Sequence, residues 1–352
     1  MDSKNWVKLV LGVCFSILCI IAALVIIVDP YFHFHAPFDG ISYIMEEEVY
    51  MNDGIVKNFD YDTVITGTST SSPFSVALTN ELFDVKAVKV SFSGEGFKRV
   101  GDNLRTAIAH QPNLKTVFWG IDTIWFSTDE NWTAHASYPE YLYDDDLLND
   151  ANYLFNGDVL LYKVFPQISR TLKGEPAKSF DDYKHYDEPG RENALEKYER
   201  PEREEKEIEE AETRELFDNL ERNFEENVCS VIEENPDITF YTFFPPYSIC
   251  WWDQYHQYGW GVVERRIAME KYAIEKLISY ENVHMFSFTT NFEMICDLDN
   301  YNDNVHYAEG TASRCLSWMK EGAYELTEDN YESYIKEVTD FMRDYDYDAI
   351  FE

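Results

Sequence analysis

Three residues from distant parts of the chain could together act on an acyl carbonyl. Asp303 and His306 form a D-x-x-H pair in a polar turn, and Ser69 lies in the hydroxyl-rich run TGTSTSS at residues 66–72. At this spacing a carboxylate can accept a hydrogen bond from one imidazole nitrogen and fix the tautomer, so that the other nitrogen can take a proton from a serine. The residue types therefore predict a triad in the chain order Ser, Asp, His.

The hydroxyl run at residues 66–72 has an alternative role. Serine and threonine side chains before a helix usually cap its first turn, and Pro73 and Phe74 mark the expected start of such a helix. A serine in a strand-to-helix turn can instead stand at the sheet edge, where helix N–H groups stabilise an oxyanion. We expect the catalytic role for Ser69 and cap or turn roles for its neighbours.

Two glycine-containing turns are expected to complete the site. Gly94 lies in the sequence SFSGEG at residues 91–96, and its backbone N–H is expected to join that of Ser69 in an oxyanion hole. Gly120 and Asp122 end another apolar segment in the sequence GID. Asp122 is expected to hold a loop or a substrate hydroxyl.

Short apolar runs are expected to place these residues at one edge of a sheet. They are rich in β-branched and aromatic residues and predict five strands, Thr63–Thr68, Ala87–Phe92, Thr116–Asp122, Ile238–Pro246 and Val283–Phe288. The runs are almost continuously apolar, as in strands covered on both faces. With helical periodicity between them, they predict an α/β fold with a doubly wound, mostly parallel, flavodoxin-like sheet. Sites in such sheets lie at the carboxyl ends of the strands.

The segments between the strands differ in length and character. Helical apolar stripes are predicted at Val100–Ile108, Leu216–Val231, Val263–Ile278 and Gly310–Leu326. Residues 123 to about 215 are too many for a simple crossover and predict an insertion. Its aromatic and acidic first half is a candidate lid or substrate rim, and Arg191–Glu215 predicts a charged, solvent-facing helix. The aromatic run Phe243–Trp252 either packs against sugar rings or seals the core.

The N-terminal region contains a candidate membrane anchor. Leu9–Val28 is twenty residues without a charge, which at about 1.5 Å per residue spans the hydrocarbon core. This run exceeds the apolar core of most signal peptides, the alternative assignment. Lys4 and Lys8 precede it and acidic residues follow it, so the positive-inside rule places the N-terminus in the cytoplasm. We therefore expect a tip and anchor at residues 1–30 and an extracytoplasmic domain at residues 31–352.

Charge and composition exclude several classes of protein. The chain of 352 residues has 29 Lys and Arg against 66 Asp and Glu, a net charge of −37, which argues against nucleic-acid binding. It has no glycine-rich phosphate loop and no EF-hand pattern, so neither a cofactor nor a metal ion is expected.

The four cysteines outside the anchor allow three disulfide pairings or remain ordinary buried thiols.

The motifs resemble those of SGNH/GDSL-type hydrolases. The resemblance covers roughly residues 61–326 and is closest to the membrane-anchored envelope branch that includes teichoic-acid D-alanylation and alginate O-acetylation proteins. The nucleophile block of the family is similar to Gly67-Thr68-Ser69, and its D-x-x-H block is matched by Asp303 and His306. Gly94 matches the glycine block loosely, and Gly120-Ile121-Asp122 stands where the family has Gly-x-Asn. An ionised aspartate cannot donate to an oxyanion, so either its pKa is raised or the hole has two donors.

The resemblance implies a serine O-acyl esterase or acyltransferase that acts on a cell-envelope glycan or glycolipid, with a membrane-bound O-acyltransferase as a partner. The alternative is a non-catalytic domain of the same fold that binds polymer or such a partner. A metal-dependent phosphotransfer enzyme that uses Asp62 and Asp122 is a third alternative, but it leaves the D-x-x-H pair without a role.

Overall fold

The computed structural model describes residues 2–134, 138–182 and 188–352. By compactness the chain forms two units. Unit 1 comprises Met1–Asp60 with Ser137–Tyr183, and unit 2 comprises Tyr61–Ala136 with Lys184–Glu352. The division at residue 30 into an anchor and an extracytoplasmic domain concerns the side of a membrane and stays a prediction.

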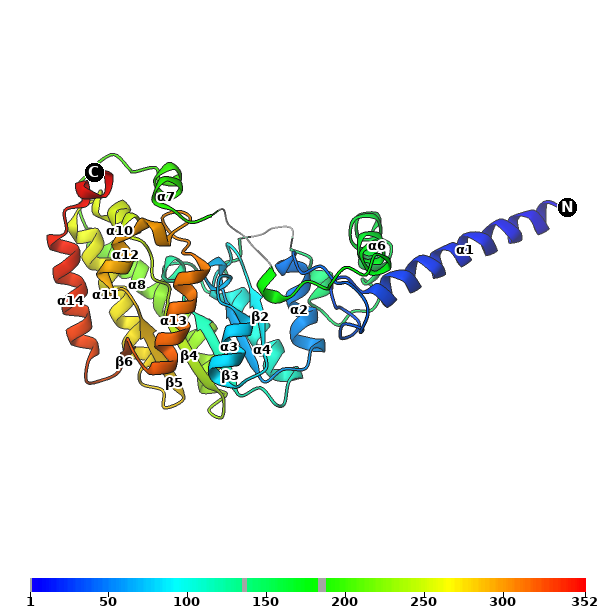
Figure 1. Cartoon of the computed structure of the whole chain (residues 1–352), viewed down its shortest axis with the longest axis horizontal. Helices are drawn as coiled ribbons and strands as arrows, with labels where there is room; N and C mark the ends of the chain where they lie inside the picture. The colour runs from blue at the N-terminus through cyan, green and yellow to red at the C-terminus, as the bar shows by residue number, and fades with distance from the viewer. Residues whose placement is uncertain (1, 135–137, 183–187) are drawn as a thin grey trace. The chain divides into compact units, whose positions relative to one another are not determined.

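Unit 2 is built on one six-stranded sheet (Figure 1). Its strands are β1 (Thr63–Gly67), β2 (Ala87–Ser91), β3 (Thr116–Gly120), β4 (Thr239–Phe244), β5 (Val283–Ser287) and β6 (Glu325–Leu326). The spatial order is β2-β1-β3-β4-β5-β6, with all neighbours parallel except the β5–β6 pair. The predicted α/β class, parallel sheet and first five strands are confirmed. The sixth strand was not predicted, since a two-residue strand carries no periodicity.

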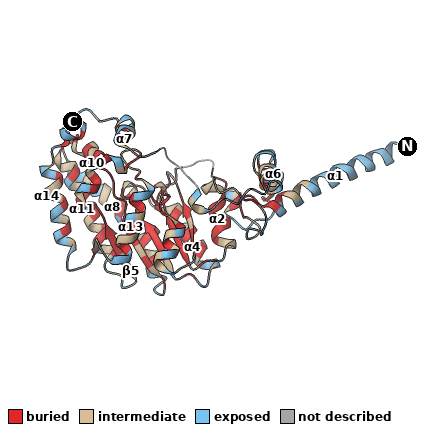
Figure 2. Cartoon of the chain, viewed as in Figure 1, coloured by how far each residue is buried: buried red, intermediate tan, exposed pale blue. Residues whose placement is uncertain are grey.

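The strands are mostly apolar because both faces of the sheet are covered. Val64, Ile65, Val117 and Phe118 are fully buried, and Figure 2 shows buried residues along the strands and exposed residues on the outer sides of the helices. The helices of unit 2 are α3 (Val76–Phe83), α4 (Phe97–His110), α7 (Arg191–Lys197), α8 (Glu210–Phe224), α9 (Ser230–Glu233), α10 (Ile249–His256), α11 (Trp260–Leu277), α12 (Phe292–Cys296), α13 (Glu309–Glu321) and α14 (Tyr331–Asp344). Helix α3 packs on α13, whereas α8 packs on α4 and α11. This is the helix, sheet, helix arrangement of a doubly wound fold.

The long charged helix predicted over Arg191–Glu215 is wrong in its middle. The chain is helical in α7 and again from Glu210, but not in the twelve residues between them. Pro201 lacks an N–H group and disfavours helical backbone at the preceding residue. The intervening backbone bonds elsewhere: Glu204 N donates to Gln257 O (2.9 Å) and Lys206 N to Tyr258 O (3.0 Å).

Unit 1 contains the apolar N-terminal helix. Helix α1 (Ser3–Val28) has the length and composition of a membrane span, and most of its side chains are exposed. The unit also contains α2 (Glu48–Asn58), α5 (Ala151–Leu154), a π-helical segment η4 (Val159–Val164) and α6 (Phe165–Leu172), which continues η4. The aromatic and acidic first half of the predicted insertion is therefore divided, since residues from 137 onward group with the N-terminal segment.

The cysteines form no disulfide within the described residues, which include all six. Burial raises the pKa of the Cys229 and Cys250 thiols to about 12 and that of Cys296 to about 11. Thiols with such a pKa are almost fully protonated at neutral pH and react slowly.

Candidate active site

Ser69 lies at the carboxyl edge of the sheet, in the turn that follows β1. The strands β1 and β3 are paired neighbours, but β1 leads on to β2 on one side and β3 leads on to β4 on the other, so their connections leave in opposite directions. Such a switch point is where open α/β sheets bind ligands. Ser69 begins a single 3-10 turn (Ser69–Ser71), and the next α-helix begins only at Val76, with Ser75 Oγ capping it through Leu78 N at 3.1 Å. Ser75 therefore caps the α-helix, Thr68 Oγ1 caps the 3-10 turn by accepting from Thr70 N, and the expected helix start at Pro73-Phe74 is wrong by a few residues.

The structure brings the three predicted triad residues together. Ser69 Oγ lies 2.9 Å from His306 Nε2, and His306 Nδ1 lies 2.7 Å from Asp303 Oδ2. Both distances are those of good hydrogen bonds. The side chains of Asp303 and His306 are 20% and 21% exposed, so the site is held by the fold and still open to a substrate.

Asp303 is held in its charged, imidazole-orienting form. Its Oδ1 accepts from the backbone N–H groups of Val305 (2.8 Å) and His306 (2.7 Å), which leaves Oδ2 for the ring nitrogen. Burial raises the pKa of the Asp303 carboxyl, but the hydrogen bonds and charge of His306 outweigh burial and hold that pKa below its usual value. An ionised Asp303 requires an N–H on Nδ1 of His306, so Nε2 is left to accept the proton of Ser69.

The D-x-x-H turn is tied to the nucleophile turn by residues that the motif analysis did not single out. Tyr301 and Tyr307 pair across the turn in an antiparallel bridge, and the buried Tyr307 hydroxyl donates to the carbonyl of Thr70, next to Ser69. Ser248 Oγ donates to Asn304 O at 2.8 Å. The only sequence signal for Tyr307 was its position beside His306.

The predicted glycines have different surroundings. Gly67 (φ +143°) and Gly120 both face Ser71 Oγ, and a Cβ on either would overlap it. Gly120 is thus required for packing between the ends of β1 and β3. Gly94 is exposed and lies in a turn closed by Glu95 N to Phe92 O (3.0 Å), where its φ of +74° favours glycine. Its role in an oxyanion hole stays a prediction.

Asp122 holds the turn before Ser69. Its carboxylate is buried and accepts from Thr68 Oγ1 (2.6 Å), from Ile124 N (3.2 Å) and from the Tyr247 hydroxyl. Burial, followed by the nearby Asp122 charge, raises the pKa of Tyr247 far above its usual range, so its hydroxyl stays a donor. Of the expected roles of Asp122, the structure favours holding a loop.

Replacing Asp122 with asparagine, the residue in the matching family motif, is expected to lower stability and not to raise activity. One amide N–H₂ would face a hydroxyl that now donates, which costs about 1–3 kcal/mol of unfolding free energy. Denaturant unfolding and p-nitrophenyl acetate hydrolysis measure the two effects. The control is Asp129→Asn, because exposed Asp129 accepts only through an oxygen that asparagine retains (Asn131 N, 2.9 Å). Higher activity at unchanged stability would contradict this role.

A second buried carboxyl, that of Glu270, is hydrogen-bonded to Thr123, the residue after Asp122. Arg266 Nη2 donates to Thr123 Oγ1 at 2.7 Å, and its guanidinium lies over the Trp251 ring at 5.0 Å. Burial raises the pKa of Glu270 to about 7, although the Arg266 charge and a hydrogen bond with Thr123 act in the opposite direction. The Glu270 carboxyl therefore changes between its neutral and its charged form near neutral pH, next to the residues that hold the site.

The free energy of unfolding is expected to depend on pH through the titration of Glu270. Folded Glu270 binds its proton more tightly than the unfolded chain, whose value is near 4.5, so the free energy of unfolding falls as pH rises from about 4.5 to about 7. The shift corresponds to about 3 kcal/mol. Glu270→Gln stays neutral and should lose this decrease in denaturant titrations across that range. Glu275→Gln, an exposed position on the same helix, is the control, and parallel curves for wild type and Glu270→Gln would contradict the assignment.

Aromatic side chains near the carboxyl edge fall into two groups. The run Phe243–Trp252 is buried and seals the core. Trp125 and Trp132 are half-buried and stack at 4.6 Å, and Trp132 packs against Gly96 in the turn after β2.

Within the described residues, no group of three or more His, Cys, Asp or Glu side chains could hold a metal ion.

Comparisons with known proteins were made on the whole chain. No protein-family model matches it, and no curated protein matches it. One solved structure, provisionally named as a platelet activating factor from Streptococcus pneumonia, is similar with a TM-score of 0.34 and 11% identity, over 82% of this chain and 90% of that chain. A likeness this low carries no argument about function, so the functional assignment depends on the geometry of Ser69, His306 and Asp303.

Proposed function

We propose that the chain is a serine O-acyl esterase or acyltransferase of the SGNH type. The observation that carries the proposal is the unbroken path from Ser69 Oγ through the His306 ring to Asp303, at 2.9 and 2.7 Å. A buried structural histidine would need no serine at Nε2 and no carboxylate fixed by two backbone N–H groups at Nδ1. Nucleophile, base and orienting group each meet the geometric requirement for covalent catalysis.

In the proposed reaction Ser69 Oγ attacks the carbonyl carbon of an ester while His306 Nε2 takes the serine proton. The Asp303 carboxylate stabilises the imidazolium that forms. The negative charge that develops on the carbonyl oxygen is taken up by the backbone N–H groups assigned to Ser69 and Gly94. His306 then returns the proton to the departing alcohol, which leaves an acyl group on Ser69. Water or a sugar hydroxyl, deprotonated by His306, releases that group.

The proposed substrate class follows from the proposed location. Helix α1 is long and apolar enough to span a bilayer, and Lys4 and Lys8 at its N-terminal end favour a cytoplasmic tip. The remaining chain then lies outside the cell membrane, where esters of envelope glycans and glycolipids are the acyl-bearing polymers at hand. Transfer alongside a membrane-bound O-acyltransferase is the partnership that this placement favours.

The proposal is tested with the full-length chain in detergent. p-Nitrophenyl acetate is supplied with and without a soluble glycan oligosaccharide, and both p-nitrophenol release and acetylation of the oligosaccharide by mass spectrometry are followed. Release alone supports an esterase, and release with acetylated sugar supports a transferase. If a chain that unfolds cooperatively gives neither p-nitrophenol nor acetylated sugar, the enzyme hypothesis is rejected and the non-catalytic binding domain is favoured.

A further inference from the structure

Exposed large apolar side chains are concentrated in unit 1. Outside α1, the described residues of this kind include Leu147, Leu148, Leu161, Tyr162, Phe165 and Leu172, a set that we name the apolar face. Leu148 and Leu172 are 86% and 83% exposed. In unit 2, Phe351 is the one such residue among those described. Contiguous exposed apolar surface is unfavourable in water and marks a contact with another apolar phase.

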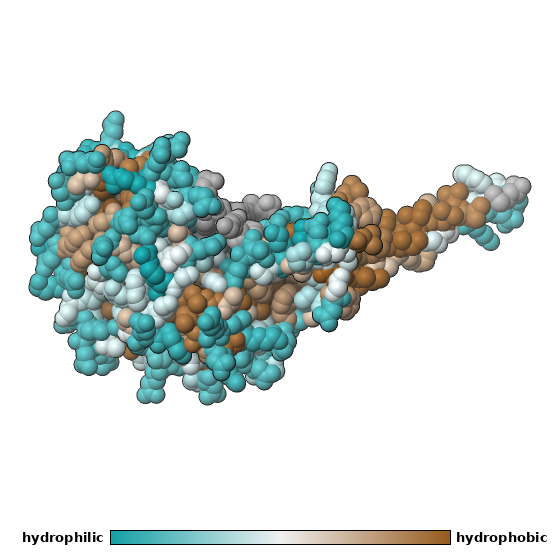
Figure 3. Space-filling model, viewed as in Figure 1, coloured by the Kyte–Doolittle hydropathy of each residue, from teal (hydrophilic) through white to brown (hydrophobic). Residues whose placement is uncertain are grey.

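The apolar face continues from the C-terminal end of α1. Helix α1 contacts both η4 and α5, and Val25 and Val28 in its last turns are buried there. The η4–α6 segment is amphipathic, since Val159, Val164 and Gln167 are buried on the opposite side. Figure 3 shows the hydrophobic colour of α1 continuing onto the adjoining part of unit 1.

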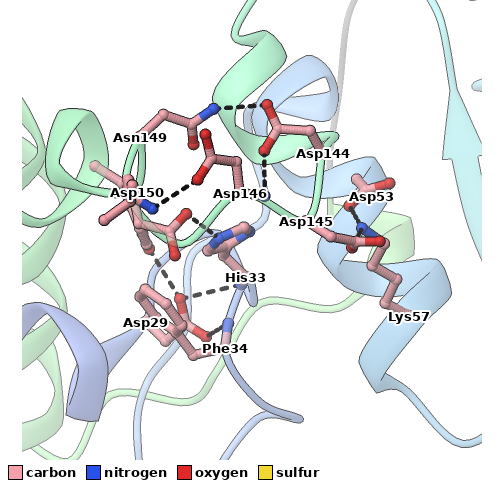
Figure 4. A network of polar contacts seen from close by, with 12 residues as sticks. Asp29, His33, Phe34, Asp53, Lys57, Asp144, Asp145, Asp146, Asn149 and Asp150 are labelled. Atoms are coloured by element: carbon pink, nitrogen blue, oxygen red, sulfur yellow. Dashed lines mark hydrogen bonds and ion pairs between the residues drawn. The ribbon is translucent and has the colours of Figure 1, made fainter.

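The end of α1 is fixed within unit 1 by a buried polar network (Figure 4). Asp29 caps the helix and is fully buried. Its Oδ2 accepts from the backbone N–H groups of Phe34 (2.7 Å) and His35 (3.1 Å), and its Oδ1 accepts from the Tyr153 hydroxyl of α5 (2.9 Å). His33 Nε2 lies 2.9 Å from Asp150 Oδ1. Because α1 is bonded in this way to residues 33–35 and α5 and also packs on η4, it cannot change its depth without carrying α5 and η4 with it.

Charge in the same segment is opposite to that of the rest of the chain. Residues 159–178 contain four basic side chains, Lys163, Arg170, Lys173 and Lys178, and one acidic side chain, Glu175. Lys163 forms an ion pair with Glu47 and Arg170 forms one with Glu175 (2.8 Å), so the positive charge offered to headgroups rests mainly on Lys173 and Lys178. The whole chain has a net charge of −37. Basic side chains beside exposed aliphatic and aromatic ones are the composition of helices that lie in the plane of a membrane interface, where the charges meet anionic headgroups.

We propose that the apolar face lies in the headgroup and upper acyl region of the leaflet from which α1 emerges, with phospholipid as its occupant. The proposal depends on α1 crossing the bilayer, which is part of the proposed function, but not on catalysis. The twenty uncharged residues Leu9–Val28 reach the end of α1, so η4 and α5, packed on its last turns, are at the depth where the hydrocarbon ends. Tyr162 suits this depth because its ring is apolar and its hydroxyl is polar.

The test uses the full-length chain in phosphatidylcholine vesicles with about a quarter phosphatidylglycerol. An environment-sensitive fluorophore is attached to a cysteine introduced by Leu161→Cys or Leu172→Cys, after Cys14 and Cys19 are replaced by serine. Labelling of the four remaining native cysteines is measured in the Cys14→Ser, Cys19→Ser chain that has no introduced cysteine, and is subtracted. Lipids with a nitroxide high on the acyl chain quench fluorophores at that depth. Native Cys14, kept alone in α1, reports the span, and Glu234→Cys, an exposed position of unit 2, is the aqueous control.

Quenching at positions 161 and 172 should exceed that at position 234 by at least about twofold. Quenching at Cys14 with aqueous values at 161 and 172 would overturn the proposal and leave the anchor intact, so that the apolar face would instead fit a protein partner. An aqueous value at Cys14 as well would overturn both the anchor and this proposal. Neither result alters the assignment of Ser69.

Discussion

Replacing Ser69 with alanine is expected to lower kcat/KM for p-nitrophenyl acetate by at least about three orders of magnitude. Ser69 Oγ is the atom placed 2.9 Å from His306 Nε2, and in the proposed reaction it is the atom that forms the acyl-enzyme. Residual hydrolysis over water would come from binding and from the oxyanion donors. The measurement is initial-rate kinetics on the full-length chain in detergent.

The matched control is Ser72→Ala, three residues further along the same run. Ser72 accepts from Lys89 Nζ (2.6 Å) through its backbone carbonyl, which alanine retains. We expect Ser72→Ala to keep kcat/KM within a few-fold of wild type and both variants to unfold cooperatively. Equal rates for Ser69→Ala and wild type would remove Ser69 from the chemistry.

Asp303→Asn is expected to lower kcat by about four orders of magnitude with little change in fold. The two backbone N–H groups of Val305 and His306 require an oxygen at the Oδ1 position. The amide N–H₂ would therefore face Nδ1 of His306 and require it to accept, which moves the ring proton to Nε2. In that tautomer the imidazole cannot deprotonate Ser69. Single-turnover and steady-state kinetics at neutral pH measure the loss.

Asp299→Asn provides the control for this substitution. Asp299 is exposed, lies four residues earlier and accepts from Arg191 N at 2.9 Å, which the asparagine oxygen can also do. We expect wild-type kcat from it. Near-wild-type kcat in Asp303→Asn would show that Asp303 orients nothing that the reaction needs, and His306 would have to act with another partner.

The strands of the fold were predictable because burial on both faces of a sheet gives a residue pattern that can be recognised in the local sequence. Runs such as Thr63–Gly67 and Thr239–Phe244 carry no charged residue and are rich in β-branched and aromatic side chains, as parallel strands covered on both faces require. The helical stretch predicted over residues 198–209 was wrong. The charge periodicity continues past Pro201, but the proline ring disfavours helical backbone there. Edge strand β6 was missed because its pairing with β5 is long-range and only two residues long.

The triad was predictable because two of its members are three residues apart and the third follows a recognisable strand. What holds it in place was not, since those contacts join residues distant in sequence. Tyr307 meets Thr70, and Tyr247 meets Asp122. Each is a tyrosine in an aromatic-rich chain, and no local pattern separates it from tyrosines that only fill the core. The grouping of residues 137–183 with the N-terminal segment has the same cause.

The most direct test of the central claim is covalent labelling of the full-length chain with a fluorophosphonate, followed by peptide mass spectrometry. Fluorophosphonates react with serines that a base has activated. If His306 activates Ser69, the label is found on Ser69, and His306→Ala abolishes it without unfolding the chain. Labelling of another serine, or labelling of Ser69 that persists in His306→Ala, would contradict the triad.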